Sequence, residues 1–140
     1  MKKVSFTVLG EPEGKGRPKF RRQGQYVKTY TPEQTISYEN LIKTEYRRQC
    51  GDVFFGQGVP LEIIITAYYS VPKSVSKKKR QAMLDRVIRP CKKPDADNVV
   101  KCFMDAGNKV IFYDDVQVVD LVVRKYYDER PRVVVTVREV

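Results

Sequence analysis

Residues 93–120 constrain this chain most, because they hold six aspartates in a protein whose formal net charge is +10 at pH 7. Pro94 predicts an extended approach to this stretch, and a helical segment is expected to follow. On that helix Asp97, Lys101 and Asp105 are spaced by four residues and therefore lie along one face. An acidic island in a basic chain is the arrangement expected where carboxylates hold a metal ion against a polyanion.

Length and composition bound the class of protein. The chain has 140 residues, so we expect a single domain over residues 1–140. Nine tyrosines and six phenylalanines favour a globular fold over disorder. The excess of positive charge indicates a polyanionic partner, either nucleic acid or an anionic membrane surface. No apolar run approaches the roughly 18–20 residues of a membrane span, and the N-terminus lacks a signal-peptide cleavage site, so we expect a soluble protein.

Two residue types limit the chemistry. Histidine is absent, which excludes His-based acid–base catalysis, serine triads and His–zinc sites. The three cysteines, Cys50, Cys91 and Cys102, are odd in number and show no Cys-x-x-Cys spacing. This argues against a disulfide framework or a zinc cluster and predicts a reducing cytoplasm. Any enzyme chemistry must therefore come from carboxylates, lysine, tyrosine or a metal ion.

Hydrophobic periodicity predicts an α+β fold, with a mixed sheet of about five strands packed against about three helices. Helices are expected near residues 32–50, 77–88 and 97–109. Strands are expected at residues 2–9, 26–30, 61–70, 116–127 and 131–139, with the last two forming a hairpin around 128–131. Each helix has a start signal: a Thr-x-x-Gln capping box at residues 31–34, Ser76, and Asp97 or Asn98.

Two basic segments are candidate phosphate contacts. Residues 10–25 contain glycines and prolines that break regular structure, and a loop is expected there. That loop carries Lys15, Arg17, Lys19, Arg21 and Arg22, which can clamp phosphates. The alternative is an ordinary solvated basic loop.

Residues 72–93 form the second basic segment, with nine basic side chains against one acid, Asp85. The candidate contacts there are Lys73, Lys77, Lys78, Lys79, Arg80, Lys92 and Lys93. Because the segment leads directly into the aspartates, salt-dependent binding to a phosphate backbone is favoured over a merely solvated face.

The residue types also predict what the acidic stretch does. Mg²⁺ takes hard oxygen ligands, usually one or two carboxylates together with substrate phosphate and water. One or two such ions would polarise a scissile phosphate, activate a water molecule and stabilise the leaving oxygen. Lys101, one helical turn from Asp97, would stabilise charge on the phosphoryl group in the transition state. From spacing alone the alternatives stay open: Asp97 as a helix cap, and Asp114-Asp115 as part of a turn.

A set of motifs runs from about residue 4 to residue 126. They are Lys93-Pro94-Asp95-Ala96-Asp97-Asn98, Lys101, Asp105-Ala106 and Asp114-Asp115-Val116-Gln117-Val118, with weaker matches in Gly10-x-Pro12-x-x-Lys15-x-Arg17-Pro18 and Tyr30-Thr31-Pro32. Together these motifs resemble the signature of the RusA family of Holliday junction resolvases. One departure is Gly107-Asn108-Lys109, where the family usually has Leu-Asn-Gly. A glycine there is expected to weaken the helix by up to about 1 kcal/mol and to move its end.

The resemblance implies a small homodimeric endonuclease of bacteria, phages or prophages that uses Mg²⁺, with Mn²⁺ as an alternative ion. Such enzymes bind four-way DNA junctions and nick two opposed strands symmetrically, a task that suits a two-fold protein. By motif position the metal-binding carboxylates are Asp95, Asp97 and Asp115, and Lys101 is the catalytic lysine. Asp105 and Asp114 are secondary candidates.

Three functions remain open on the sequence. The favoured one is a metal-dependent junction resolvase. A nuclease for other branched or flapped DNA would share every catalytic residue and differ only in substrate geometry. A non-catalytic DNA-binding protein, whose aspartates merely cap and bridge, is the third. It is disfavoured because binding alone gains nothing from acids placed beside phosphates.

Overall fold

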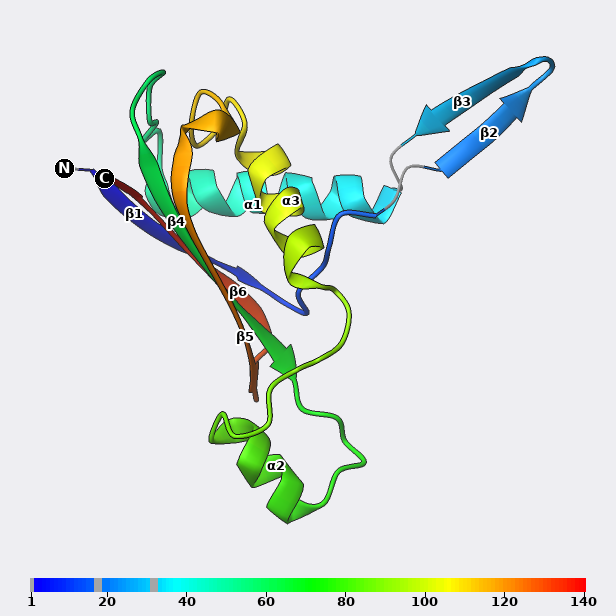
Figure 1. The fold of residues 1–140 in the computed structure, drawn as a ribbon, viewed down its shortest axis with the longest axis vertical. Coiled ribbons are helices and arrows are strands. Elements are labelled where there is room, and N and C mark those ends of the chain that lie inside the picture. Colours follow the sequence, from blue (N-terminus) through cyan, green and yellow to red (C-terminus); the bar gives the residue numbers. More distant parts are fainter. Residues whose placement is uncertain (1, 17–18, 31–32) are drawn as a thin grey trace.

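The computed structural model describes residues 2–16, 19–30 and 33–140. Its main sheet has the order β1-β6-β4-β5, from strands β1 (Lys3–Leu9), β4 (Leu61–Ser70), β5 (Val118–Asp128) and β6 (Arg132–Glu139). Among the described residues, strands β2 (Lys19–Gln23) and β3 (Tyr26–Tyr30) pair only with each other, and they stand away from that sheet (Figure 1). The helices are α1 (Glu33–Cys50), α2 (Lys77–Leu84) and α3 (Ala96–Gly107), followed by one 3₁₀ turn, η1 (Asp115–Gln117).

The predicted α+β fold with a mixed sheet and three helices is confirmed, although the sheet differs in detail. Four strands form the main sheet instead of about five, and β2 lies inside the segment expected to be a loop. The predicted hairpin of the last two strands is wrong. β5 and β6 flank β4 on opposite sides, β5 parallel and β6 antiparallel to it. The run Ile63-Ile64-Ile65 makes β4 apolar on both faces, which suits a central strand, and residues 129–131 carry no hairpin-turn signal.

One face of the main sheet is covered by α1 and α3. Phe6 of β1 packs edge-on against Tyr46 of α1, with 5.3 Å between ring centroids, and lies 6.4 Å from Phe103 of α3. Tyr38 of α1 meets Phe103 from the other side at 6.1 Å. These four rings are buried, so they fix both helices on the same face of the sheet.

The helix ends differ from the predicted ones by a few residues. Ser76 caps α2 as expected, accepting the Lys79 amide at 3.2 Å, but the helix ends at Leu84 because Arg86 takes a left-handed backbone with φ of 66°. Asp95, not Asp97 or Asn98, holds the N-cap position of α3. The capping-box residues Thr31 and Pro32 lie outside the described residues. Within the described part of the chain, none of the helices combines the length and apolar character needed to cross a membrane.

Gly107 ends α3 in close contact with the core. Its carbonyl oxygen accepts hydrogen bonds from the amides of Val110, Ile111 and Phe112 at 3.0, 2.8 and 3.3 Å. A Cβ atom at this position would lie only 2.8 Å from Cζ of the buried Phe112 ring. The departure from the family pattern therefore has a packing reason.

We expect Gly107→Ala to lower the free energy of unfolding by up to about 2 kcal/mol net, because the added methyl group overpacks the Phe112 contact at a cost of about 1–3 kcal/mol. This outweighs the gain of about 1 kcal/mol in helix propensity. Chemical denaturation of both proteins measures the change. Gly56→Ala is the matched control, since a Cβ there meets nothing within 4 Å; equal stability of Gly107→Ala and wild type would contradict the packing argument.

Candidate active site

The outer face of α3 carries the candidate catalytic residues because its inner face is apolar. The buried residues of the helix are Val99, Cys102, Phe103, Ala106 and Gly107. Asp97 and Lys101 are consequently exposed, and Asp105 is half-buried on the same face, as the spacing predicts. Asp95 precedes the first turn and accepts a hydrogen bond from the Asn98 side-chain amide at 2.6 Å.

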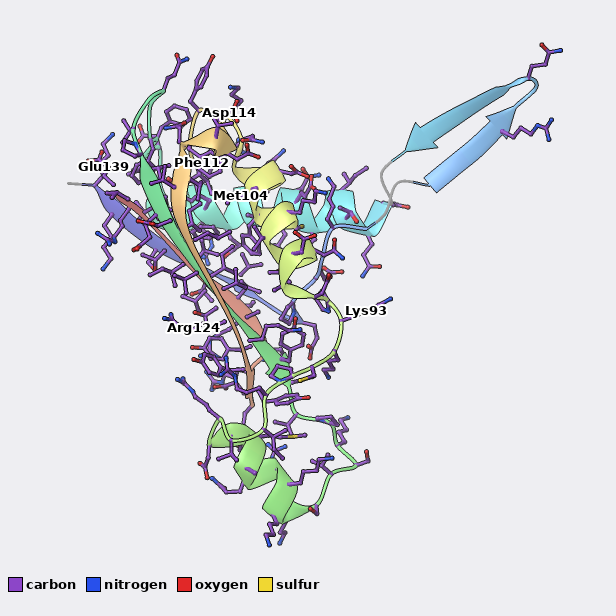
Figure 2. The ribbon with its side chains drawn as sticks, in the orientation of Figure 1. Lys93, Met104, Phe112, Asp114, Arg124 and Glu139 are labelled. Carbon is purple, nitrogen blue, oxygen red and sulfur yellow. The ribbon has the colours of Figure 1, made fainter. Side chains whose placement is uncertain are left out.

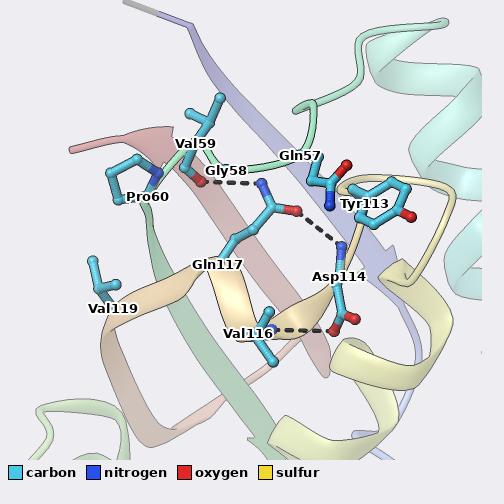
Figure 3. A pocket seen from close by; sticks show the side chains of 9 residues that line it. All are labelled: Gln57, Gly58, Val59, Pro60, Tyr113, Asp114, Val116, Gln117 and Val119. Atoms are coloured by element: carbon cyan, nitrogen blue, oxygen red, sulfur yellow. Dashed lines mark hydrogen bonds between the residues drawn. The ribbon is translucent and has the colours of Figure 1, made fainter.

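A second acidic group lies beyond the C-terminal end of α3. Asp114 and Gln117 form a capping box around η1: the Asp114 carboxylate accepts the Val116 amide at 3.2 Å, and the Gln117 side chain accepts the Asp114 amide at 2.9 Å (Figure 3). The Asn108 side chain accepts the Asp115 amide at 3.0 Å. Sequence reasoning missed both Gln117 and Asn108, although Asp-x-x-Gln is a visible capping pattern.

Asp115 titrates abnormally. Burial raises the pKa of its carboxyl above the ordinary value, and the hydrogen bond and charge of neighbouring Asp114 raise it further. The negative charge of Asp105 acts in the same direction, while Asn108 acts in the opposite one. The carboxylates of Asp105, Asp114 and Asp115 thus interact electrostatically at this end of α3.

The predicted ligands fall into two groups that one chain does not bring together. Asp95 and Asp97 lie at the N-terminal end of α3, and Asp115 lies beyond its C-terminal end. A helix of 12 residues is about 18 Å long. Figure 2 shows Lys93 and Asp114 at these opposite ends. Across residues 2–16, 19–30 and 33–140, no three His, Cys, Asp or Glu side chains are grouped so that they could hold a metal ion.

The N-terminal end of α3 is anchored on the far end of β4 and β5. The Tyr69 hydroxyl donates to the Pro94 carbonyl at 2.5 Å, and Lys125 Nζ donates to the Lys92 carbonyl at 2.7 Å. Burial raises the pKa of Tyr69, and the charge of nearby Asp95 adds to this. α3 therefore runs opposite to β5, with Asp95 near the C-terminal half of that strand.

Lys15 forms ion pairs within the protein instead of facing outward. Its Nζ lies 2.7 Å from Glu39 of α1 and 3.0 Å from Asp105 of α3. Burial opposes its charge, but these two carboxylates more than compensate and raise the pKa of Lys15. Its backbone amide also donates to the Asn98 carbonyl at 3.0 Å. Glu39 was not anticipated, and nothing in the sequence around it marks this role.

The other predicted phosphate contacts differ in their exposure and in their partners. Lys73, Lys77, Lys78, Lys79, Lys92 and Lys93 are exposed. Arg80 pairs with Glu129 at 3.5 Å, and Lys92 lies over the rings of Tyr127 and Tyr69 at 5.5 and 6.0 Å. Arg17 lies outside the described residues, and the structure does not describe the side chains of Lys19 and Arg21.

Comparison with known proteins decides the family. A family model described as "Endodeoxyribonuclease RusA" matches residues 10–138. The chain is also 39% identical over 142 residues to "Uncharacterized protein YqaN" of Bacillus subtilis (strain 168), an alignment that covers 98% of this chain and 96% of that protein. The chain belongs to the RusA family of endodeoxyribonucleases. RusA nucleases depend on a metal ion and act on branched DNA.

The donor atoms of this RusA-family chain suit a hard divalent cation. All candidate ligands are carboxylates, the type that Mg²⁺ prefers. The raised pKa of Asp115 reflects burial and like-charge repulsion, both of which a bound cation would offset. The chemistry of the residues therefore fits Mg²⁺. Because the carboxylates are divided between the two ends of α3, however, neither end has the full set of predicted ligands within one chain.

We expect Asp115→Asn to raise the free energy of unfolding by about 0.5 kcal/mol at pH 7 in EDTA, because the wild-type carboxylate must ionise against burial and Asp114. The folded pKa is raised above 3.8, so wild-type stability falls as pH rises from 3.8 through the folded pKa. The advantage of the variant should disappear below about pH 3.8. Thermal unfolding across this range tests it, with exposed Asp52→Asn as the control. A variant no more stable than wild type at pH 7 would refute the interpretation.

Proposed function

We propose that this protein is a Mg²⁺-dependent endodeoxyribonuclease that resolves four-way DNA junctions by paired nicks in opposed strands. The observation that carries the proposal is the outer face of α3, where Asp97 and Lys101 are exposed one turn apart and Asp95 stands at the N-terminus. Membership of the RusA family supports the same activity.

Each part of the site has a role in phosphodiester hydrolysis. Asp95, Asp97 and Asp115 would hold Mg²⁺, which when bound would supply Lewis-acid stabilisation of the scissile phosphate and a more acidic water molecule. Lys101 places a positive charge where negative charge develops on the phosphoryl oxygens. Lys73, Lys77, Lys78, Lys79 and Lys93 contact the phosphate backbone and hold the strand near the carboxylates.

We also propose that the enzyme is a homodimer whose metal sites are shared between protomers. Carboxylate oxygens that bind one Mg²⁺ lie about 2.1 Å from it, whereas Asp95 and Asp115 lie beyond opposite ends of a helix about 18 Å long. One site would therefore combine Asp95 and Asp97 of one protomer with the partner's Asp115. A two-fold dimer then presents two equivalent sites to two opposed strands of a junction.

Cleavage of synthetic four-way junction, flap and linear duplex DNA tests the activity. We expect paired symmetric nicks in the junction with Mg²⁺ and none in EDTA. Asp97→Asn should lower the rate at least about 100-fold while DNA binding persists, because the phosphate contacts are unchanged; Asp52→Asn should cut normally. Preferred cutting of the flap would favour a nuclease for other branched DNA. Binding without metal-dependent cutting would leave a DNA-binding protein.

Mixing two inactive variants tests the shared sites. Asp97→Asn and Asp115→Asn homodimers are each expected to be inactive. In a mixed dimer one site would carry both substitutions and the other neither. Since an equal mixture makes about half of the dimers mixed, exchange of protomers should restore single nicks at about a quarter of the wild-type rate. If each site lay within one chain, every site in the mixture would carry a substitution and no activity would return.

A further inference from the structure

The side chain of Gln117 is buried beside the acidic pair Asp114-Asp115, although glutamine is a polar residue. Gln117 is only 7% exposed. A buried amide group is costly unless its hydrogen-bonding atoms find partners. Gln117 meets this requirement with three side-chain hydrogen bonds, two donated and one accepted. Where these bonds lead shows what the residue does.

The two donated bonds anchor Gln117 on the turn that precedes β4. Its Nε2 donates to the Gly56 carbonyl at 2.6 Å and to the Val59 carbonyl at 3.0 Å (Figure 3). These carbonyls belong to a tight turn, since the Val59 amide also donates to the Gly56 carbonyl at 3.4 Å. The turn is tied to the core next to this point, because the amide of buried Phe55 donates to the Ile111 carbonyl at 2.9 Å. The Gln117 side chain therefore has a fixed position.

The accepted bond holds the backbone of the acidic pair. Gln117 Oε1 accepts the Asp114 amide at 2.9 Å, and Asn108 Oδ1 accepts the next amide, that of Asp115, at 3.0 Å. Asn108 is the C-terminal cap residue of α3, so the two successive amides are tied to different elements. With both N–H groups bonded, the peptide between Asp114 and Asp115 has a fixed orientation. The Asp115 carboxylate can then move only through its own side-chain torsions.

The acidic pair needs this restraint because its carboxylates repel one another. Asp105 and Asp114 both place negative charge near Asp115. Without a cation, this repulsion favours conformations in which the Asp115 carboxylate moves away from the other two. Hydrogen bonds to two neutral side-chain amides oppose that displacement and add no further charge. A glutamate at position 117 would not serve, since an ionised carboxylate has no proton to donate to the two turn carbonyls.

We infer that Gln117 is a positioning residue, which together with Asn108 holds the Asp115 carboxylate where it can bind the metal ion. The inference rests on the proposed function, in which Asp115 is a metal ligand, and assigns a role to a side chain that the proposed function leaves without one. Hydrogen bonds that orient a metal ligand typically contribute about 10–100-fold to metal affinity or activity.

Metal affinity tests this role without relying on cleavage. Gln117→Met keeps a side chain of similar length but removes all three hydrogen bonds. We expect it to weaken Mn²⁺ binding by about 10–100-fold, measured from the electron paramagnetic resonance signal of unbound Mn²⁺. Asn108→Ala, which frees only the Asp115 amide, should change the affinity in the same direction. Gln49→Met is the matched control, because at the β1 edge Gln49 likewise bonds a backbone amide and carbonyl, those of Thr7, at 2.8 and 2.7 Å.

Amide hydrogen exchange separates positioning from folding. In Gln117→Met the Asp114 amide should exchange at least about tenfold faster, while the amides of Ile63 and Ile65 in the central strand stay protected. Equal acceleration at all three amides would indicate a merely structural role and overturn the inference.

The metal titration also distinguishes failure of the inference from failure of the proposed function. Wild-type Mn²⁺ affinity in folded Gln117→Met and Asn108→Ala would overturn the inference alone, as would an equal loss of affinity in Gln49→Met. A wild-type protein that bound no Mn²⁺ would overturn the proposed metal-dependent function, and the inference with it.

Discussion

The site depends on how α3 is held against the sheet. Phe103 packs between Phe6 of β1 and Tyr38 of α1, with ring centroids 6.4 and 6.1 Å apart. Burying side chains of this size stabilises the fold by about 1.5–3 kcal/mol each. A helix fixed in rotation by Phe103, Val99 and Ala106 has only one outer face, and that face carries Asp97 and Lys101. The candidate catalytic residues therefore need no contacts of their own to be presented to solvent.

The same rigid helix separates the acidic groups. Asp95 and Asp97 are held at its start because Tyr69 and Lys125 donate hydrogen bonds to the Pro94 and Lys92 carbonyls. Asp115 is held beyond its end by Asn108. Neither group can approach the other without breaking α3. In the proposed homodimer, the partner's Asp115 would remove the conflict by completing the site at the start of α3. Metal binding would then depend on dimerisation.

The sequence predicts local features better than long-range ones. The spacing of Asp97, Lys101 and Asp105 places them on one helix face, because helical periodicity is local. Strand order is not local, so the pattern of the 116–127 and 131–139 segments predicts a hairpin, whereas β4 lies between them in the sheet. Likewise, the sequence motif that contains Asp95, Asp97 and Asp115 does not specify how far apart these side chains lie in the fold. Glu39, 66 residues before Asp105 in the sequence, reaches the site only through the packing of α1 on α3.

Net charge also overstates how many basic residues are available to DNA. Lys15 is neutralised by Glu39 and Asp105, and Arg80 pairs with Glu129. The exposed lysines that remain in residues 73–93 are concentrated on α2 and the segments beside it, below the N-terminal end of α3 (Figure 1). In the proposed DNA complex, a phosphate backbone attracted to these lysines would pass beside Asp95 and Asp97. The paired basic residues would then serve the fold, and the unpaired ones would direct the strand to the end of α3 where the candidate metal ligands are most exposed.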